Sequence, residues 1–300
     1  MQTRKGILLT GGRGCRLYPA TIGVNKHLLP VWDRPLVYYP LATLIQSGVR
    51  EILVITTEHE RRAFETLFGH GARWGLRFSY ETQSEALGAA HALTLAEDWL
   101  DGAPCVLAMG DNIFLGERMQ PLLQAAAKES SGATVFAARV DDPQQYGVVR
   151  LNQQGRPIAL EEKPARATSP WAVTGLYFYD GRATQLARQL APSVRGEIEI
   201  TDLNQAYLQA DELRVVPIGS GIAWWDCGTL PKLHDAAASI RNLEVETGRK
   251  CPSPEEAALR AGCLSAESWQ AMLARLPDGP YRRYLELLPT TPTIANGAAA

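Results

Sequence analysis

A glycine-rich segment near the start of the chain carries residue types that bind phosphate. The apolar residues 6–9 are followed by three glycines, Gly11, Gly12 and Gly14. A glycine-rich turn after a buried strand exposes backbone N–H groups, and phosphate oxygens can approach them because no side chain intervenes. Arg13, Arg16 and Lys26 add positive charges a short way along the chain. This combination predicts a site for a phosphorylated ligand.

Two common glycine-rich phosphate motifs do not match this segment. Counting G-x-G-x-x-G from Gly12 places Leu17 where the dinucleotide-binding motif needs its third glycine. The G-x-x-x-x-G-K-[ST] pattern of P-loops does not occur in the sequence. The failed glycine pattern disfavours a nicotinamide-dependent dehydrogenase.

Two aspartates follow apolar runs in a way that suits a metal site. Asp111 comes after residues 106–109, and Asp226 comes after residues 223–225. Open α/β sheets bind ligands just beyond the carboxyl ends of their strands. Mg²⁺ prefers one or two protein carboxylates together with phosphate oxygens and water. The pair therefore predicts a Mg²⁺ site, although either aspartate alone would also fit a turn or a helix cap.

The elements that must position these residues alternate along the first half of the chain. Strands are predicted over residues 5–10, 51–57, 76–81, 104–109 and 133–140, and helices over residues 35–47, 89–100 and 122–127. This alternation predicts an α/β fold with a Rossmann-like, mostly parallel sheet and helices on both faces. Close-spaced strands over residues 147–151, 157–161 and 172–179 then predict a small antiparallel insertion at the edge of the sheet.

Composition and charge limit the classes of partner. Hydrophobic residues make up 46% and charged residues 21%, as in ordinary globular proteins. The 30 Lys and Arg residues against 32 Asp and Glu residues exclude an extended nucleic-acid or anionic-membrane surface. The five cysteines are scattered without a CxxC pair, which predicts buried free thiols and a reducing, cytoplasmic location. No early apolar stretch is long enough for a signal peptide or a membrane span.

Several motifs, taken in order, match one enzyme family. The chain reads GGRGCRLYP from Gly11 and NKHLLPV from Asn25. It continues with Gly110-Asp-Asn112, Tyr146-Gly-Val-Val149, Glu161-Glu-Lys-Pro164, Val173-Thr-Gly-Leu-Tyr177, Arg195-Gly-Glu197 and Trp225-Asp-Cys-Gly-Thr229. Over about residues 4–288 it resembles the sugar-1-phosphate nucleotidylyltransferases, whose opening pattern is GGxGTRLxP followed by KxLLPVxxxP. Within that family it is most similar to the short bacterial thymidylyltransferases.

The resemblance implies a Mg²⁺-dependent transfer of a nucleotidyl group from dTTP to glucose 1-phosphate, giving dTDP-glucose and pyrophosphate. It gives catalytic roles to Arg16 and Lys26 and metal binding to Asp111 and Asp226. It assigns nucleotide binding to Leu9, Gly11, Gly12, Gly14, Gln83, Gly88 and Asp111. It assigns sugar-phosphate binding to Tyr146, Gly147, Glu162, Lys163, Val173, Tyr177 and Arg195.

The resemblance also implies a domain organisation and an assembly. We expect a nucleotidyltransferase core over residues 1–230, with a nucleotide-binding part at about 1–140 and a sugar-binding part at about 141–225. A helical C-terminal segment is expected over residues 231–288, with Ser253 as a helix N-cap, and a disordered tail over residues 289–300. The family further implies a homotetramer built as a dimer of dimers.

Several residues depart from the family pattern. Cys15 stands where the family has Thr, and His27 replaces Gln beside Lys26, where packing is the expected role. The loop over residues 83–92 keeps Gln83 and Gly88 but reads Q-x-E-x-L-G-x-x-H-A, as in uridylyltransferases and longer thymidylyltransferases. Because thymine and uracil differ by one methyl group, worth ~1–3 kcal/mol in a pocket, the sequence leaves dTTP and UTP both open.

A second nucleotide site, which the family uses for feedback inhibition, is altered in this chain. Leu115 replaces an aromatic residue there, and Ser220 replaces an arginine, so weaker anion binding is expected. Two other functions stay open beside transfer from dTTP to glucose 1-phosphate. One is transfer of a uridylyl group, or transfer to another sugar 1-phosphate. The other is a non-catalytic regulator that binds a sugar nucleotide.

Overall fold

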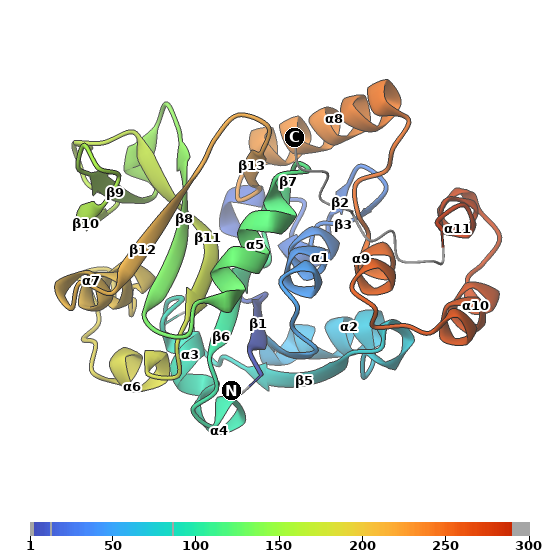
Figure 1. Cartoon of the computed structure of the whole chain (residues 1–300), viewed down its shortest axis with the longest axis horizontal. Helices are drawn as coiled ribbons and strands as arrows, with labels where there is room; N and C mark the ends of the chain where they lie inside the picture. The colour runs from blue at the N-terminus through green and yellow to red at the C-terminus, as the bar shows by residue number, and fades with distance from the viewer. Residues whose placement is uncertain (1–2, 13, 86, 290–300) are drawn as a thin grey trace, which may run out of the picture.

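A nine-stranded mixed sheet forms the centre of the chain in a computed structural model that describes residues 3–12, 14–85 and 87–289 (Figure 1). Arg13 and all of the predicted tail except Pro289 lie outside the described residues. The strands are β1 (Lys5–Leu9), β4 (Glu51–Thr56), β5 (Arg77–Thr82), β6 (Cys105–Met109), β8 (Ala133–Arg139), β9 (Gly147–Leu151), β10 (Pro157–Glu162), β11 (Trp171–Tyr179) and β12 (Leu213–Ile218).

The sheet follows the order β10-β9-β11-β6-β1-β4-β5, and β8 pairs with both β11 and β12. Strands β6, β1, β4 and β5 are parallel neighbours, and β11 runs antiparallel to β6. The predicted α/β fold with a mostly parallel sheet is therefore confirmed. The predicted antiparallel strands also occur, as β9, β10 and β11, and they pair in the order β10-β9-β11 at one edge of this same sheet.

Helices cover both faces of the sheet because its strands are apolar on both sides (Figure 1). Along β1, Leu8 packs into one core, and Ile7 and Leu9 pack into the other. The first core contains residues of α1 (Tyr38–Gln46), α2 (Glu58–Phe68), α5 (Met119–Lys128) and α9 (Pro254–Arg260). The second contains residues of α3 (His91–Leu95), α4 (Glu97–Leu100), α6 (Ala183–Arg188) and α7 (Ile200–Gln209).

Two small sheets hold the loops that follow the glycine-rich segment and Asp111. One pairs β2 (Pro30–Val31) with β3 (Arg34–Pro35), so α1 begins later than the sequence predicted. The other pairs β7 (Asn112–Leu115) with β13 (Ala223–Asp226), and β7 was not predicted. Four 3₁₀ helices occur in the described residues: η1 (Cys15–Leu17), η2 (Lys26–Leu28), η3 (Ala72–Trp74) and η4 (Pro143–Gln145).

Every element described after Leu230 is a helix: α8 (Leu230–Thr247), α9, α10 (Ala266–Arg275) and α11 (Pro280–Glu286). Ser253 caps α9, since its side chain accepts the Glu256 N–H at 3.1 Å, as predicted. The buried Arg34 ties the segment before α9 to the core by donating to the Cys251 carbonyl at 2.8 Å. This bond links the C-terminal segment to the β2–β3 hairpin.

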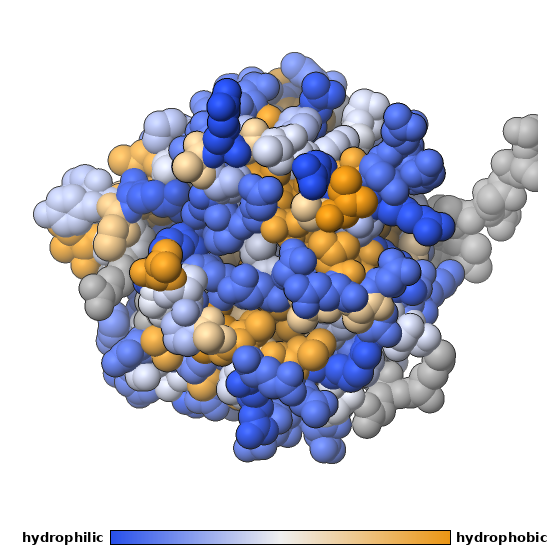
Figure 2. Space-filling model, turned by 90° about the vertical axis from the view of Figure 1, so that its left-hand side faces the viewer, coloured by the Kyte–Doolittle hydropathy of each residue, from blue (hydrophilic) through white to orange (hydrophobic). Residues whose placement is uncertain are grey.

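The surface on the side of β9, β10 and α7 is mixed, with separate hydrophobic patches among hydrophilic residues (Figure 2). Within the part of the chain that the structure describes, no helix combines the length and apolar character needed to cross a membrane. Three cysteines, Cys105, Cys227 and Cys251, are buried free thiols, as predicted. Cys15 is exposed instead, because it lies on the turn of η1 at the surface.

Candidate active site

The glycine-rich segment and Asp111 meet at one edge of the sheet. Because β1 and β6 are parallel neighbours, the residues that follow them lie at the same edge, beyond the carboxyl ends of the strands. Gly110 donates its backbone N–H to the Leu9 carbonyl at 2.8 Å. A side chain at Gly110 would lie 2.8 Å from Cδ2 of His27. This close packing brings Asp111 next to the segment that carries Lys26.

A cavity of about 280 Å³ opens at this edge. Many of the predicted site residues line it: Arg16, Lys26, Asp111, Tyr146, Gly147, Glu162, Lys163, Val173, Tyr177, Arg195 and Asp226. The other predicted residues are described but do not line it: Leu9, Gly11, Gly12, Gly14, Gln83 and Gly88. Some of these adjoin it, since a Cβ at Gly12 would lie 3.9 Å from Cε of Lys26. The cavity therefore collects the predicted metal and sugar-phosphate residues, with the glycine-rich turn beside them.

Lys26 and Asp111 form a nearly buried ion pair. Nζ of Lys26 lies 2.5 Å from Oδ2 of Asp111, and Asp111 is only 4% exposed. Nδ2 of Asn112 donates to Oδ1 of Asp111 at 3.0 Å. Burial by itself would raise the pKa of Asp111, but the charge of Lys26 and the hydrogen bonds from Lys26 and Asn112 act together with smaller contributions to hold that pKa below its usual range. Asp111 is therefore ionised at neutral pH.

Asp226 lies beside Asp111 because of the pairing between β7 and β13. In that antiparallel pair Asp226 is opposite Asn112, the residue after Asp111. Oδ1 of Asp226 accepts the Gly228 N–H at 3.2 Å. Burial raises the pKa of Asp226, and the negative charge of Asp111 raises it further. Two carboxylates that repel each other in this way favour a bound cation.

The donor set at this position fits Mg²⁺. Within residues 3–12, 14–85 and 87–289, no three or more His, Cys, Asp or Glu side chains gather as a metal-binding group. A metal held here would therefore take two carboxylates from Asp111 and Asp226 and complete its shell with phosphate oxygens or water. Mg²⁺ prefers that mixture, whereas softer metals prefer thiolate or imidazole ligands.

Arg16 approaches the same carboxylates through the space left by a glycine. It lies in η1, which begins after Gly14, a residue with a left-handed φ of 60°. A Cβ at Gly228 would lie 2.6 Å from Nη2 of Arg16, so a larger residue at this position would displace the guanidinium. The charge of Arg16 acts on Asp226 in the direction that lowers its pKa, against the larger effect of burial. Arg16 and Lys26 thus bring two cations to the pair of aspartates.

His27 has a packing role, as expected from the sequence. It is buried, and its Nδ1 lies 2.7 Å from Oδ1 of Asn25. Burial and the neighbouring charge of Lys26 lower its pKa to about 3. The imidazole is therefore neutral at physiological pH, and its ring holds the turn between Asn25 and Lys26 in place.

Glu162 organises the end of the cavity that was assigned to the sugar. Its Oε2 accepts a hydrogen bond from Oγ1 of Thr201 at 2.5 Å. Its Oε1 lies 3.3 Å from Nζ of Lys163 and 3.2 Å from Nη2 of Arg195. A Cβ at Gly147 would lie 3.3 Å from Oε2, so this glycine leaves room for the carboxylate. Glu162 therefore orients the two cations that were predicted to bind the sugar phosphate.

Arg195 contacts two further carboxylates. Its Nη2 lies 2.8 Å from both carboxylate oxygens of Glu199 and 3.2 Å from Oε2 of Glu197. Glu199 is only 5% exposed, so this contact fixes the guanidinium at the wall of the cavity. The raised pKa of Arg195 results from these carboxylates, which outweigh the opposing effect of burial. A phosphate at this position would join a preformed charge network.

Sequence reasoning missed three residues that hold the site together. Asn112 accepts hydrogen bonds from the Gly175 N–H at 3.0 Å and from Nε1 of Trp224 at 2.7 Å. Lys232 donates to the hydroxyl of Tyr146, and its Nζ lies 3.6 Å from Oδ2 of Asp226. Asn112 lies in the recognised motif Gly110-Asp-Asn112 and Trp224 precedes the motif that begins at Trp225, so both positions could have been found from the sequence. Lys232 lies in a helix with no distinctive spacing.

Gln83 and Gly88 were predicted to contact the nucleobase. Nε2 of Gln83 lies 3.0 Å from Nδ1 of His91 and 3.4 Å from the Gly88 carbonyl oxygen. A Cβ at Gly11 would lie 3.5 Å from Oε1 of Gln83. Gln83 therefore bridges the loop before α3 and the glycine-rich turn.

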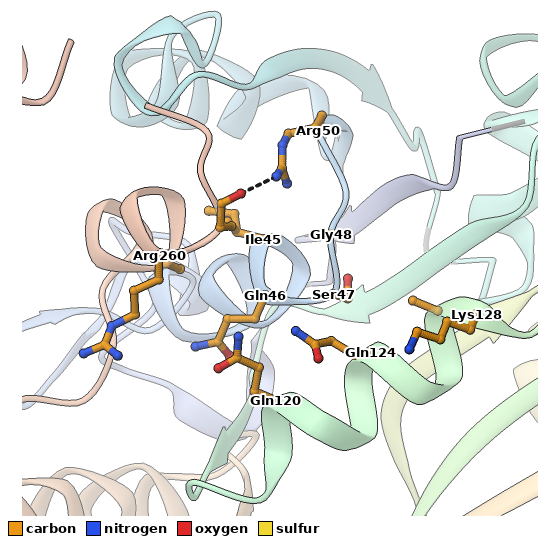
Figure 3. Close-up of a pocket in the computed structure, with 12 residues that line it drawn as sticks. Ile45, Gln46, Ser47, Gly48, Arg50, Gln120, Gln124, Lys128 and Arg260 are labelled. Carbon is orange, nitrogen blue, oxygen red and sulfur yellow. Dashed lines mark hydrogen bonds between the residues drawn. The ribbon is translucent and has the colours of Figure 1, made fainter. Parts of the chain in front are cut away.

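A second cavity, of about 390 Å³, lies between α1, α5 and α9 (Figure 3). Among the described residues its lining includes no carboxylate, and Leu115 and Ser220 do not line it. Two of its cations have protein partners. Arg50 donates to the Ala261 carbonyl at 2.7 Å, and Arg260 lies 2.6 Å from Oε1 of Glu256. Paired carboxylates suited to Mg²⁺ thus occur in the first cavity and not here.

Comparison with known proteins gives consistent matches. The family model described as "Nucleotidyl transferase" matches residues 5–242. A glucose-1-phosphate thymidylyltransferase of Xanthomonas campestris pv. campestris (strain B100) is 46% identical over 96% of this chain and 98% of its own. One from Neisseria meningitidis is 44% identical over 94% and 98%. The solved structure of a Bacillus anthracis protein in complex with sucrose is 38% identical in sequence to this chain and has a TM-score of 0.74 to it. The match covers 80% of this chain and 96% of the other.

Proposed function

Because the chain belongs to the nucleotidyl transferase family, we propose that it transfers a thymidylyl group from dTTP to glucose 1-phosphate, giving dTDP-glucose and pyrophosphate. Membership of this family makes the chain a nucleotidyltransferase, as the resemblance in its motifs predicted. The names of the relatives support the sugar phosphate and the thymine base. Both substrates belong to the proposal.

The arrangement of charges in one cavity carries the proposal. Arg16 and Lys26 lie beside the glycine-rich turn, and Lys163 and Arg195 contact Glu162 in the same cavity. Asp111 and Asp226 line that cavity as well. Two groups of cations and a carboxylate pair suit the binding of two phosphorylated substrates. A site for one phosphate would not need both groups.

The chemistry of the reaction agrees with what the cavity contains. An oxygen of the sugar phosphate attacks the α-phosphorus of the triphosphate, and the bond to the β-phosphate breaks to release pyrophosphate. A phosphate monoester is largely dianionic near neutral pH, so no general base is needed. The neutral, buried His27 fits this requirement, since it is not placed to act as one. Catalysis then depends on orientation and on neutralising charge.

Each part of the cavity has a proposed role. Arg16 and the backbone of the glycine-rich turn hold the β- and γ-phosphates, and Lys26 contacts the α-phosphate. Lys163 and Arg195 hold the phosphate of the sugar, and Glu162 accepts hydrogen bonds from sugar hydroxyls. Tyr146, Gly147, Val173 and Tyr177 shape the sugar pocket. Asp111 and Asp226 would hold Mg²⁺, which when bound neutralises phosphate charge.

The proposal is tested by measuring pyrophosphate release from purified protein with glucose 1-phosphate and each of dTTP, UTP, CTP, ATP and GTP, with and without Mg²⁺. We expect Mg²⁺-dependent release with dTTP. Faster release with UTP would make the protein a uridylyltransferase, and release only with another hexose 1-phosphate would change the sugar. No pyrophosphate release with any substrate pair, together with tight binding of a sugar nucleotide, would identify a non-catalytic regulator.

The homotetramer implied by the family and the cytoplasmic location predicted from the cysteine pattern remain part of this proposal. Sedimentation velocity of the purified protein tests the first, because a tetramer of this chain has four times its mass of 32.8 kDa. A stable monomer or dimer at micromolar concentration would contradict it.

Cys15 offers a chemical test of the phosphate end of the cavity. It is exposed and lies between Gly14 and Arg16, so alkylation by N-ethylmaleimide should block the approach of a triphosphate. We expect a loss of activity of more than ~10-fold, slowed by added dTTP, because misplaced substrate reacts far more slowly. Pyrophosphate release and mass spectrometry of the modified cysteine measure this.

Two variants serve as controls for the alkylation. Cys15→Ser should resist inactivation. Cys263→Ser should stay sensitive because it keeps Cys15, and it is a suitable control because Cys263 is half-buried in the C-terminal segment, away from the turn. Full activity after complete modification of Cys15 would contradict the assignment of this turn to the triphosphate.

A further inference from the structure

A short backbone bridge joins two loops that contribute to different parts of the site. Ile198 donates its N–H to the Leu87 carbonyl at 2.7 Å. Its own carbonyl accepts the Ala90 N–H at 3.2 Å. Residues 87–90 form the end of the loop between β5 and α3, and Ile198 precedes α7. The two hydrogen bonds therefore link segments that are far apart in the sequence.

Gly88 lies inside this bridge and permits it. Its φ of +98° falls in the left-handed region, which residues other than glycine rarely adopt. A Cβ at Gly88 would overlap the carbonyl oxygen of Ile198 and would lie 2.8 Å from its nitrogen. Both are backbone atoms, so no side-chain rotation relieves the contact. Any larger residue at this position must move the two loops apart.

One side of the bridge supports the residue assigned to the nucleobase. The carbonyl of Gly88 accepts a hydrogen bond from Nε2 of Gln83 at 3.4 Å, and Gln83 is only 7% exposed. Ala89, the next residue, lines the active-site cavity. The position of Gly88 therefore affects both the Gln83 amide, which the proposed function assigns to the base, and the wall of the cavity.

The other side of the bridge supports the phosphate-binding arginine. Ile198 stands between Glu197 and Glu199, and both glutamates bind the guanidinium of Arg195. Oγ of Ser193 donates to Oε1 of Glu199 at 2.7 Å, so the whole turn is hydrogen-bonded. A shift of Ile198 would move both partners of Arg195. That shift would change the geometry offered to the sugar phosphate.

We propose that Gly88 is a positioning residue for the sugar-phosphate side of the site, because it lets residues 87–90 and Ile198 bond as one unit. This inference rests on the proposed function, which assigns Arg195 to the sugar phosphate and Gly88 to the nucleobase. It extends that function by predicting that a substitution in the nucleobase loop alters affinity for the other substrate. The link runs through backbone atoms, so Gly88 acts through Ile198 and Arg195 without touching the sugar phosphate.

The test compares KM and kcat for both substrates in three variants. Gly88→Ala is expected to raise the KM for glucose 1-phosphate by roughly tenfold at saturating dTTP, since displaced binding groups weaken binding strongly. Gln83→Ala removes a base contact but leaves the bridge intact, so it should raise only the KM for dTTP. Ala90→Pro removes the N–H that bonds Ile198, and the φ of −70° at Ala90 suits proline. It should also raise the KM for glucose 1-phosphate, which keeps the proposal testable if Gly88→Ala does not fold.

Gly132→Ala is the matched control. Gly132 has a φ of +76°, and a Cβ there would overlap the carbonyl oxygen of Glu212, so the local strain resembles that at Gly88. Gly132 precedes β8 and does not line the active-site cavity. We expect a lower melting temperature with both KM values within about twofold of wild type, since strain outside the site affects folding and not binding.

Three outcomes would overturn the proposal. In the first, Gly88→Ala and Ala90→Pro raise only the KM for dTTP, which means that the bridge does not affect binding of the sugar phosphate. In the second, Gly132→Ala raises the KM for glucose 1-phosphate as much as they do, which means that lost stability explains the effect. In the third, wild-type protein shows no activity with any substrate pair, and the proposed function then fails too. Only the third outcome affects both.

Discussion

Asp226→Asn is expected to lower kcat by about 100- to 1,000-fold while leaving the folded protein at least as stable as wild type. The substitution keeps the oxygen that accepts the Gly228 N–H and removes only the negative charge. Loss of one of two carboxylate ligands should remove several kcal/mol of transition-state stabilisation that Mg²⁺ supplies. Steady-state pyrophosphate release at several Mg²⁺ concentrations measures the effect.

The stability of this variant follows from the raised pKa of Asp226. Burial and the charge of Asp111 make the ionised form unfavourable in the folded state. At pH 7 the wild-type protein therefore carries a penalty that Asp226→Asn removes. As the pH falls towards the raised pKa, protonation of wild-type Asp226 relieves the same penalty. The gap in melting temperature between variant and wild type should shrink between pH 7 and pH 4.

Asp235→Asn is the control for this prediction. Asp235 is exposed on α8, so the same charge change there should leave kcat and the pH dependence of stability unchanged. Added Mg²⁺ should stabilise wild type and Asp235→Asn but not Asp226→Asn. If Asp226→Asn keeps its full Mg²⁺-dependent rate, Asp226 is not a metal ligand.

The motif loops could be predicted from the sequence because each is short and directly follows an apolar run. Residues 6–9 and 105–109 are continuous apolar stretches, as expected for strands buried on both faces. Adjacent parallel strands end at the same edge, so the turn after Leu9 and the loop at Asp111 had to meet. The α/β class and this edge of the site thus follow from local pattern and sheet geometry.

Contacts between distant segments could not be predicted in this way. Nothing in residues 112–115 distinguishes a strand that pairs with residues 223–226, yet this pairing brings Asp226 to Asp111. The hydrogen bond between Lys232 and Tyr146 depends on how α8 packs against the rest of the chain, and the spacing of residues in the sequence does not predict that packing. The approach of Gly88 to Ile198 also appears only once the loops are folded together. These contacts arise from tertiary packing, which a single sequence does not encode locally.

Helix boundaries differ for a related reason. The sequence predicts one helix over residues 89–100, but the structure divides it into α3 and α4 at Ala96. Apolar spacing is the same for one helix and for two consecutive turns, so it does not reveal the break. The start of α1 moves from residue 35 to Tyr38 because Arg34 and Pro35 pair with β2.

Lys26→Met is expected to abolish activity and, unlike Asp226→Asn, to destabilise the protein. Lys26 and Asp111 form a pair in which both side chains are nearly buried, at 2.5 Å. Removing the lysine leaves the Asp111 carboxylate without its main counter-charge, which costs about 3 kcal/mol when one partner of a buried pair is lost. We expect a fall in kcat of at least ~1,000-fold, since a cation at the reacting phosphate is also lost.

The pH dependence of Lys26→Met should be opposite to that of Asp226→Asn. In wild type, Lys26 keeps the pKa of Asp111 low against the effect of burial, so the pair adds stability above the pKa of an unfolded aspartate. This contribution is complete at pH 7 and is lost only as the pH falls through the low folded-state pKa. In folded Lys26→Met, burial raises the pKa of Asp111 without the opposing charge of Lys26, so the variant takes up a proton before wild type as the pH falls. The stability gap between wild type and Lys26→Met should therefore narrow steadily as the pH falls from 7 to 4.

Urea denaturation of wild type, Lys26→Met and Lys128→Met separates this effect from a general loss of positive charge. Lys128 is exposed at the end of α5, so its replacement should change the free energy of unfolding by less than about 0.5 kcal/mol. Millimolar Mg²⁺ should recover part of the stability of Lys26→Met, because a cation at Asp111 and Asp226 can replace the missing ammonium group. If Lys26→Met is as stable as wild type and Mg²⁺ has no effect on it, the carboxylate pair does not need a cation and the proposed metal site is wrong.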